Sequence, residues 1–271
     1  MTTVDTAVWV CLKWTAQELD ADATDVRFSG VSEADQAALE TALVLATHLA
    51  MPVRAVSVGP AAAERALREA VACGAVGGVR VDATEEMESV DVARELAAVT
   101  GRRGLVVCGD YSTDRGSGSV PAFLAHHLRL PQALGLVALA PVGDSLTATR
   151  RLDGGRREIL RVPLPCVVSV EGSVVTLRRA GLRAALAAND AAVEVRPRVT
   201  DAHSPLPTMV TPFRPRARVL PAPAGSGVLD RVRELTDAGG SSAGHGETVT
   251  LTPRDAAERI LAALREWGEL D

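Results

Sequence analysis

The feature that most constrains the fold is an alternation, over the first two-thirds of the chain, between short apolar runs and Ala/Leu-rich stretches. The apolar runs have the length of buried strands and lie at residues 7–12, 53–58, 79–81 and 105–108. The stretches with helical periodicity lie at residues 32–49, 61–73, 90–99 and 121–128. Such alternation is typical of parallel βαβ units. We therefore predict an α/β fold with a Rossmann-like, three-layer parallel sheet.

Local signals fix the ends of two of these helices. Ser32 and Asp35 have the spacing of a capping box, so Ser32 is the predicted N-cap of the first helix. Gly74 follows the second helix at the position that favours a C-cap.

After Pro131 the pattern changes to consecutive strands. Strands are predicted at 133–140, 145–152, 156–162, 166–170 and 174–177. Asp153-Gly154-Gly155 has the composition of a hairpin turn. A β-hairpin extension of the parallel sheet, followed by a short helix at 182–188, is therefore expected.

The C-terminal part has a different composition. Residues 196–223 are rich in proline and 239–246 in glycine and serine, which predicts an extended arm over 196–252. Thr252-Pro253 then begins an amphipathic helix. We expect three parts: an α/β domain at 1–195, the arm at 196–252 and the helix at 253–271.

Composition excludes several classes of function. The 271 residues carry a net charge of −5, which gives no electrostatic case for nucleic acid or an anionic membrane. Aromatic residues make up only 3% of the chain, too few for a base-stacking platform or an extensive flavin-stacking wall. Lys13 is the single lysine among 29 basic residues, a bias that codon usage alone would explain.

The cysteines and the apolar runs indicate a cytoplasmic protein. Its four cysteines, Cys11, Cys73, Cys108 and Cys166, form no C-x-x-C pair, which argues against a disulfide framework or a zinc site. The first twelve residues do not have the pattern of a signal peptide. No apolar run approaches the roughly 18 residues of a membrane span, so membrane insertion is not expected.

The clearest candidate site is the glycine-rich turn after the strand at 105–108. In an open parallel sheet ligands bind beyond the carboxyl ends of the strands, and the turn at 116–119 would offer backbone amides to a phosphate. An ordinary Gly/Ser loop without a ligand explains the turn equally well. Asp110 and Asp114 could form a carboxylate pair, although loop carboxylates are usually solvated turn formers. Without a recognisable nucleophile motif or metal-ligand motif, we predict binding or electron carriage and no catalytic residue.

From the first strand to about residue 195, several segments match the pattern of a known protein family. Residues 8–14, VWVCLKW, are similar to that family's V-x-V-K-x-V, and Lys13 falls on its lysine. Residues 32–45 resemble N-P-x-D-E-x-A-L-E-E-A-L-x-L, with Ser32 in place of Asn and Asp35 retained. Further resemblance lies in residues 55–75, in STDRGSGSVP at 112–121 and in RRLDGGRREILRVPLPCVVSV at 150–170. In combination these segments resemble the beta (small) subunit of electron transfer flavoproteins.

The resemblance implies a fold of the adenine-nucleotide-binding type and an electron carrier rather than an enzyme. Such a subunit pairs with a larger alpha subunit, helps to hold the FAD of that subunit, and shuttles electrons from a flavin-dependent dehydrogenase to a downstream acceptor. Its own pocket holds AMP or, in electron-bifurcating members, a second FAD. Carried over residue by residue, the resemblance implies these cofactor-binding positions: Cys11, Ser32, Asp35, Val58, Gly109, Asp114, Arg115, Gly116, Ser117, Gly118, Ser119 and Val120.

The resemblance also implies a partner-recognition segment at about 178–189, with Leu182 as the anchor that docks on dehydrogenases and Arg183 beside it. Two departures from the family pattern stand out. Asp114-Arg115-Gly116 replaces D-G-D, so Arg115 could either contact a phosphate or block the pocket. The segment before Leu182 lacks the family's Leu-Asn-x-P-R, and Leu182 could alternatively be a core residue of a short helix. The alternative functions are an adenine-nucleotide-dependent enzyme or a nucleotide sensor on the same fold.

Overall fold

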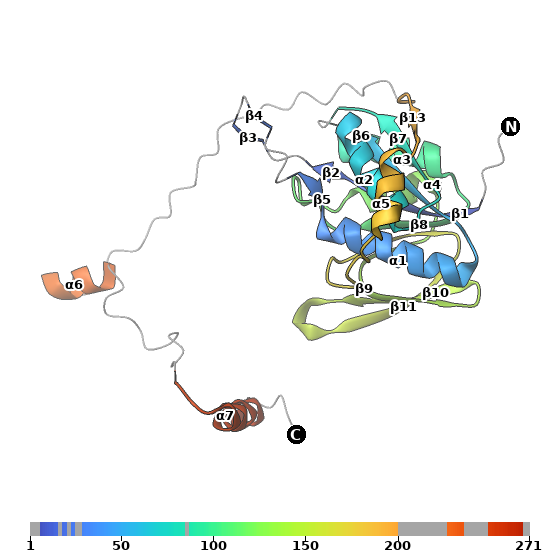
Figure 1. The fold of residues 1–271 in the computed structure, drawn as a ribbon. Coiled ribbons are helices and arrows are strands. Elements are labelled where there is room, and N and C mark those ends of the chain that lie inside the picture. The colour runs from blue at the N-terminus through green and yellow to red at the C-terminus, as the bar shows by residue number, and fades with distance from the viewer. Residues whose placement is uncertain are drawn as a thin grey trace. The chain divides into compact units, whose positions relative to one another are not determined.

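The computed structural model describes residues 6–15, 18–20, 23–24, 29–84, 87–199, 227–235 and 249–267 (Figure 1). The chain divides into two units, 1–206 and 207–271. The candidate site lies in the first.

A nine-stranded sheet forms the centre of the first unit, in the order β11-β10-β9-β12-β8-β1-β6-β7-β13. The segment from β9 to β13 in this order is parallel, whereas β9, β10 and β11 pair in antiparallel fashion. The strands are β1 (Ala7–Cys11), β6 (Val53–Gly59), β7 (Gly77–Asp82), β8 (Gly104–Gly109), β9 (Gln132–Val142), β10 (Ser145–Arg151), β11 (Arg157–Pro163), β12 (Cys166–Val170) and β13 (Val193–Arg196). This confirms the predicted fold class.

Helices cover both faces of the sheet and complete three layers (Figure 1). On one face α1 (Glu33–Leu49) and α2 (Glu64–Cys73) share a core with β1 residues such as Val8 and Val10. On the other face α3 (Ser89–Thr100) and α4 (Val120–Leu128) pack with Trp9. All five residues of β1 are buried because helices lie above and below it, as the apolar run predicts.

The predicted helix signals have the expected geometry. Ser32 is the N-cap of α1, and its side chain accepts a hydrogen bond from the Asp35 amide at 3.0 Å. Gly74 is the C-cap of α2, with a φ of 127°. A short 3₁₀ turn, η2 (Ala61–Ala63), precedes α2, so the predicted helix at 61–73 is divided in two.

The hairpin forms as predicted, but the strand expected at 174–177 was a wrong prediction. β10 and β11 pair in antiparallel register around η3 (Asp153–Gly155). Val174, Val175 and Leu177 lie in irregular chain and pack on the core that contains α1. They cannot extend the sheet beside β12, because β8 and β9 already occupy both of its edges.

Four short strands form two small pairs outside the main sheet. These are β2 (Trp14–Thr15) with β5 (Gly30–Val31), and β3 (Glu18–Asp20) with β4 (Ala23–Thr24). These four strands were not predicted from the sequence.

The second unit contains α6 (Val228–Leu235) and α7 (Pro253–Glu266). α7 begins at the predicted position, where Thr252 accepts a hydrogen bond from the Asp255 amide. The sequence analysis assigned no helix to α6. Most of the predicted arm lies outside the described residues, at 200–226 and 236–248, and its proposed boundaries at 195 and 252 stay predictions.

Candidate functional site

A cavity of about 360 Å³ lies where the parallel sheet changes the direction of its connections. β1 lies between β6, which follows it through α1, and β8, which the chain reaches only after β7 and α3. The helices on either side of β1 and β8 therefore diverge to opposite faces, which opens a crevice at the carboxyl ends of these strands. This is where the sequence analysis expected a ligand.

Most of the residues carried over by resemblance line this one cavity. They are Cys11, Asp35, Val58, Gly109, Asp114, Arg115, Ser117, Gly118, Ser119 and Val120. Ser32 and Gly116 are not in the lining. Ser32 instead supports the site from behind, since its hydroxyl donates to the Tyr111 carbonyl at 3.3 Å. As ligand contacts, all twelve residues stay predictions.

Asp35 joins the two strand ends across the crevice. Its carboxylate accepts a hydrogen bond from the Lys13 amide at 2.9 Å and another from the Gly109 amide. Burial raises the pKa of Asp35 to about 7, against the opposing effect of these two hydrogen bonds. Asp35 therefore connects β1, β8 and α1 at the floor of the cavity.

Two glycines in the lining are required by close backbone contacts. A Cβ on Gly109 would lie 2.8 Å from the backbone nitrogen of Asp35 and 2.4 Å from its Oδ1. Gly118 has a φ of +57°, and a Cβ there would lie 2.3 Å from the Asp110 carbonyl oxygen. Any larger residue at either position would displace the wall of the cavity.

The N-terminus of α4 faces the same cavity. Ser119 is its N-cap residue, and both Val120 and Pro121 are in the lining. The first amides of a helix carry a partial positive charge and lack intrahelical partners, so this end favours an anionic group. The hydroxyls of Ser117 and Ser119 lie 3.0 Å apart beside it.

The glycine-rich turn (residues 110–119) crosses the cavity and is attached on both sides. On the β1 side the Lys13 ammonium pairs with Asp114, and the Thr15 and Thr113 hydroxyls lie 3.0 Å apart. Burial tends to raise the pKa of Asp114, but the hydrogen bonds from the Lys13 ammonium, the Arg115 amide and the Ser112 side chain together outweigh burial, and the pKa falls to about 2. On the α3 side the Arg115 guanidinium donates to the Met87 carbonyl at 3.1 Å.

The third wall of the cavity was not predicted from the sequence. It consists of Met87, Ser89, Val92 and Leu96, from the start of α3 and the segment before it. The only available signal was that the third predicted helix precedes the strand at 105–108, which ends at the switch point.

A family model of the electron transfer flavoprotein domain matches residues 26–200. The chain belongs to the electron transfer flavoprotein family.

Its relatives identify it as a beta-type chain within that family. It is 30% identical over 171 residues to electron transfer flavoprotein subunit beta of Dictyostelium discoideum, covering 62% of this chain and 67% of the relative. It is 32% identical over 189 residues to the beta subunit of Mycobacterium leprae, covering 65% and 69%. For the human beta subunit the identity is 33% over 129 residues, covering 45% and 50%.

In this electron transfer flavoprotein chain the predicted recognition residues lie on α5 (Leu182–Asn189), which contacts α2. Leu182 is 77% exposed, so the alternative that it is a core residue is wrong. Arg183 is also exposed, and Leu186, one turn further on, is 59% exposed. The docking role of Leu182 and Arg183 stays a prediction.

The flavoprotein chain has no cluster of three or more His, Cys, Asp or Glu side chains suited to a metal ion among its described residues. Cys11 and Cys108 are both in the cavity lining, and all four cysteines are free. A hydrogen bond with Cys11 and burial raise the pKa of Cys108 well above its usual value, which makes its thiol unreactive. No helix in the described part is long and apolar enough to cross a bilayer.

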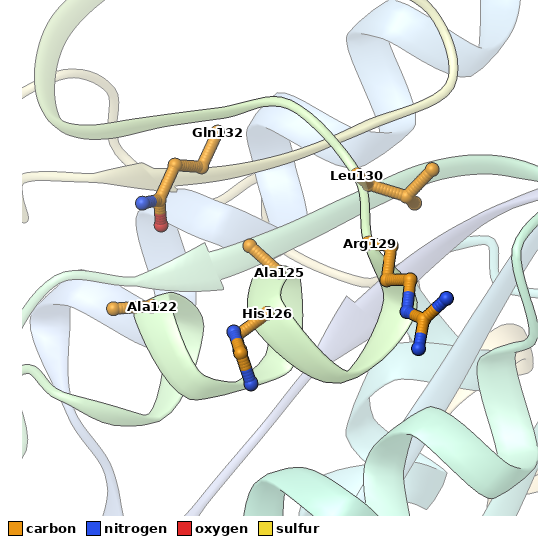
Figure 2. A pocket seen from close by; sticks show the side chains of 6 residues that line it. All are labelled: Ala122, Ala125, His126, Arg129, Leu130 and Gln132. Atoms are coloured by element: carbon orange, nitrogen blue, oxygen red, sulfur yellow. The ribbon is translucent and has the colours of Figure 1, made fainter.

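A second hollow, of about 340 Å³, lies at the C-terminal end of α4 (Figure 2). Its lining residues are Ala122, Ala125, His126, Arg129, Leu130 and Gln132. They include no acid, hydroxyl or thiol, and the His126 and Arg129 side chains point in different directions in Figure 2. This hollow offers no arrangement comparable to that of the strand-end cavity.

Proposed function

We propose that this chain is the small subunit of a heterodimeric electron transfer flavoprotein. It pairs with an alpha subunit, binds an adenine nucleotide in its own cavity and helps to hold the FAD of the alpha subunit. The heterodimer carries electrons from a flavin-dependent dehydrogenase to a downstream acceptor. The observation that carries this proposal is the convergence of the family's nucleotide-binding positions on one cavity at the switch point of the sheet.

AMP fits this cavity better than a second FAD does. Its volume of about 360 Å³ lies near the lower end of the range for small-molecule sites, about 300–1,000 Å³. Among the residues that the structure describes, Trp14 and Tyr111 are the only aromatic residues in the lining, which leaves little surface for stacking an isoalloxazine ring. The N-terminus of α4, at Ser119 and Val120, favours the phosphate of the nucleotide. The base and the ribose would then lie in the deeper part of the cavity, beside the carboxyl ends of the strands.

The chain's own residues position a nucleotide and perform no acid–base step. Asp35 has a pKa near that of a general base, but its carboxylate already accepts two backbone amides. It therefore stabilises the crevice. The Arg115 guanidinium donates a hydrogen bond to the Met87 carbonyl at the rim of the cavity. In this arrangement the Arg115 side chain lines the cavity without filling it. The FAD bound in the heterodimer supplies the electron transfer.

We assign the recognition of other proteins to residues that do not line the cavity. The exposed side chains of Leu182 and Arg183 would dock the dehydrogenase, and the arm at 196–252 would wrap the alpha subunit. α7 has an unburied apolar stripe that includes Ile260, Leu261 and Trp267, as expected of a segment that packs on a partner.

Absorption spectra of the purified protein test the proposal. The chain expressed alone should be colourless, because the alpha subunit holds most of the flavin contacts. The heterodimer obtained by co-expression should be yellow. A co-purifying heterodimer without flavin absorption would contradict the proposal.

The alternative is an adenine-nucleotide-dependent enzyme or sensor, and it makes a different prediction. The cavity and the raised pKa of Asp35 are the observations that favour this alternative. We expect no turnover when the chain is incubated with ATP, measured as release of ADP, AMP or pyrophosphate. Turnover that is lost in Asp35→Asn would favour the enzyme, and a stable nucleotide-binding monomer with no alpha-type partner would favour the sensor.

A further inference from the structure

The glycine-rich turn is fixed at its base and attached at its tip through side-chain contacts. At the base, the Asp110 amide donates to the Val170 carbonyl at 3.1 Å, and Ser32 holds the Tyr111 carbonyl. At the tip, Asp114 and Arg115 are consecutive residues that reach opposite sides of the cavity. The tip therefore forms a strap across the opening.

The attachment on the first side joins the strap to the end of β1. The Lys13 ammonium pairs with the Asp114 carboxylate, and the hydroxyls of Thr15 and Thr113 form a second contact beside it. Lys13, Thr15 and Asp114 all line the cavity, so this contact lies on its rim.

The attachment on the second side joins the strap to the start of α3. The Arg115 guanidinium donates to the Met87 carbonyl at 3.1 Å and lies 3.8 Å from the Glu88 carboxylate. Met87 and Arg115 also line the cavity. A ligand below the strap would thus be covered from the β1 wall to the α3 wall.

We propose that Lys13 and Arg115 are positioning residues that hold the strap closed, so that nucleotide exchange requires both contacts to open. The proposal rests on the nucleotide-binding function proposed above and names what controls exchange at that same cavity. The Lys13 and Asp114 side chains are 42% and 37% exposed. Ion pairs this exposed contribute little to folding, which suits contacts that open and close while the domain stays folded.

If Lys13 instead bound the phosphate of the ligand directly, the opposite effect on nucleotide release would be expected. In that case Asp114 competes with the phosphate for Lys13, so Asp114→Asn would slow the release of AMP. A strap held by the ion pair predicts faster release in Asp114→Asn. It also predicts equal acceleration for adenosine, which has no phosphate.

The experiment measures dissociation of radiolabelled AMP, and separately of adenosine, from the full-length chain during a chase with unlabelled ligand. We expect Lys13→Met, Asp114→Asn and Arg115→Gln each to release both ligands roughly two- to fivefold faster. The charge swap K13E/D114K should restore the original rate to within about twofold. Thermal unfolding midpoints of the unliganded variants should be unchanged, which a merely structural role would not predict.

Arg150→Gln is the matched control. It removes an ion pair with Glu158 of nearly the same exposure, 40% and 36%, on the hairpin formed by β10 and β11. Its release rates should equal those of the unmodified chain. AMP binding with unaltered release in the three variants, or slower release in Asp114→Asn, would overturn the proposed strap alone. Failure of the unmodified chain to bind AMP or adenosine would overturn the proposed function as well.

Discussion

At the scale of single residues, the contacts of Asp35 explain most about how the site is built. It lies at the third position of the helix that follows β1, yet its carboxylate connects that helix to the ends of two strands. The capping-box spacing predicted that Asp35 lies next to Ser32. It did not predict the contact with Gly109, because that contact depends on which strands are neighbours in the sheet.

The titration of Asp35 makes stability depend on pH. Its pKa is raised from 3.8 to about 7 in the folded chain, so the folded state binds the proton more tightly than the unfolded state. The associated stabilisation is fully present below about pH 4 and is lost as the pH rises through 7. Between pH 5 and pH 8 the loss amounts to roughly 2–3 kcal/mol.

Urea unfolding of the unliganded chain at both pH values measures this loss. Asp35→Asn should abolish this part of the pH dependence. Asp190→Asn, at an exposed aspartate, is the control and should leave it intact. Equal pH dependence in the unmodified chain and in Asp35→Asn would show that burial of Asp35 does not determine its titration.

At the scale of elements, the segment between β12 and α5 is held by an ion pair. The Glu40 carboxylate, on α1, accepts three hydrogen bonds from Arg178, two from the guanidinium at 2.8 Å and one from the backbone amide at 3.0 Å. The side-chain hydrogen bond from Arg178 lowers the pKa of Glu40, although burial opposes it. The thiol of Cys73, at the end of α2, contacts the Arg178 carbonyl at 3.7 Å. The pair thus sets the position at which α5 begins.

Removing one partner of the Glu40–Arg178 pair should lower the free energy of unfolding more than removing both partners does. Arg178→Met leaves a nearly buried carboxylate without its cation, which should lower the free energy of unfolding by about 2 kcal/mol, less than for a fully enclosed pair. The double variant E40M/R178M leaves no unpaired charge and should lie within about 1 kcal/mol of the unmodified chain.

Urea denaturation measures both effects, and hydrogen exchange at the α5 amides reports whether the helix loosens. Faster exchange of α5 is expected in both variants. A double variant as unstable as Arg178→Met would contradict the account of the ion pair.

The elements were predictable where the signal is local. Buried strands such as β1 and β8 appear as apolar runs, and the caps of α1 and α2 follow from Ser32 and Gly74. The failure at 174–177 has a tertiary cause: the apolar run packs on a core, but no sheet edge is free for it. β13 was missed because its pairing with β7 joins residues more than a hundred positions apart.

The site was predictable in part for the same reason. Strand ends and the glycine-rich turn are visible in the sequence, and the resemblance implied the class of ligand that they would bind. The α3 wall and the attachment of Arg115 to Met87 depend on how distant segments pack. No spacing in the sequence encodes them.

At the scale of the whole molecule, the chain combines an α/β domain with exposed apolar surfaces of the kind that bind partner proteins. The scarcity of aromatic residues fits a subunit that shares the flavin of another chain. The exposed leucines of α5 and the apolar stripe of α7 are surfaces without a described intramolecular partner. An electron carrier needs such surfaces because its flavin must approach that of a donor protein.

Identification of the nucleotides released from the denatured heterodimer tests the central claim most directly. Chromatography of the released fraction should yield one FAD and one AMP per heterodimer. Two FADs would assign the second flavin to the cavity of this chain and overturn the preference for AMP. A heterodimer that releases no flavin would contradict the account of this chain as an electron transfer subunit.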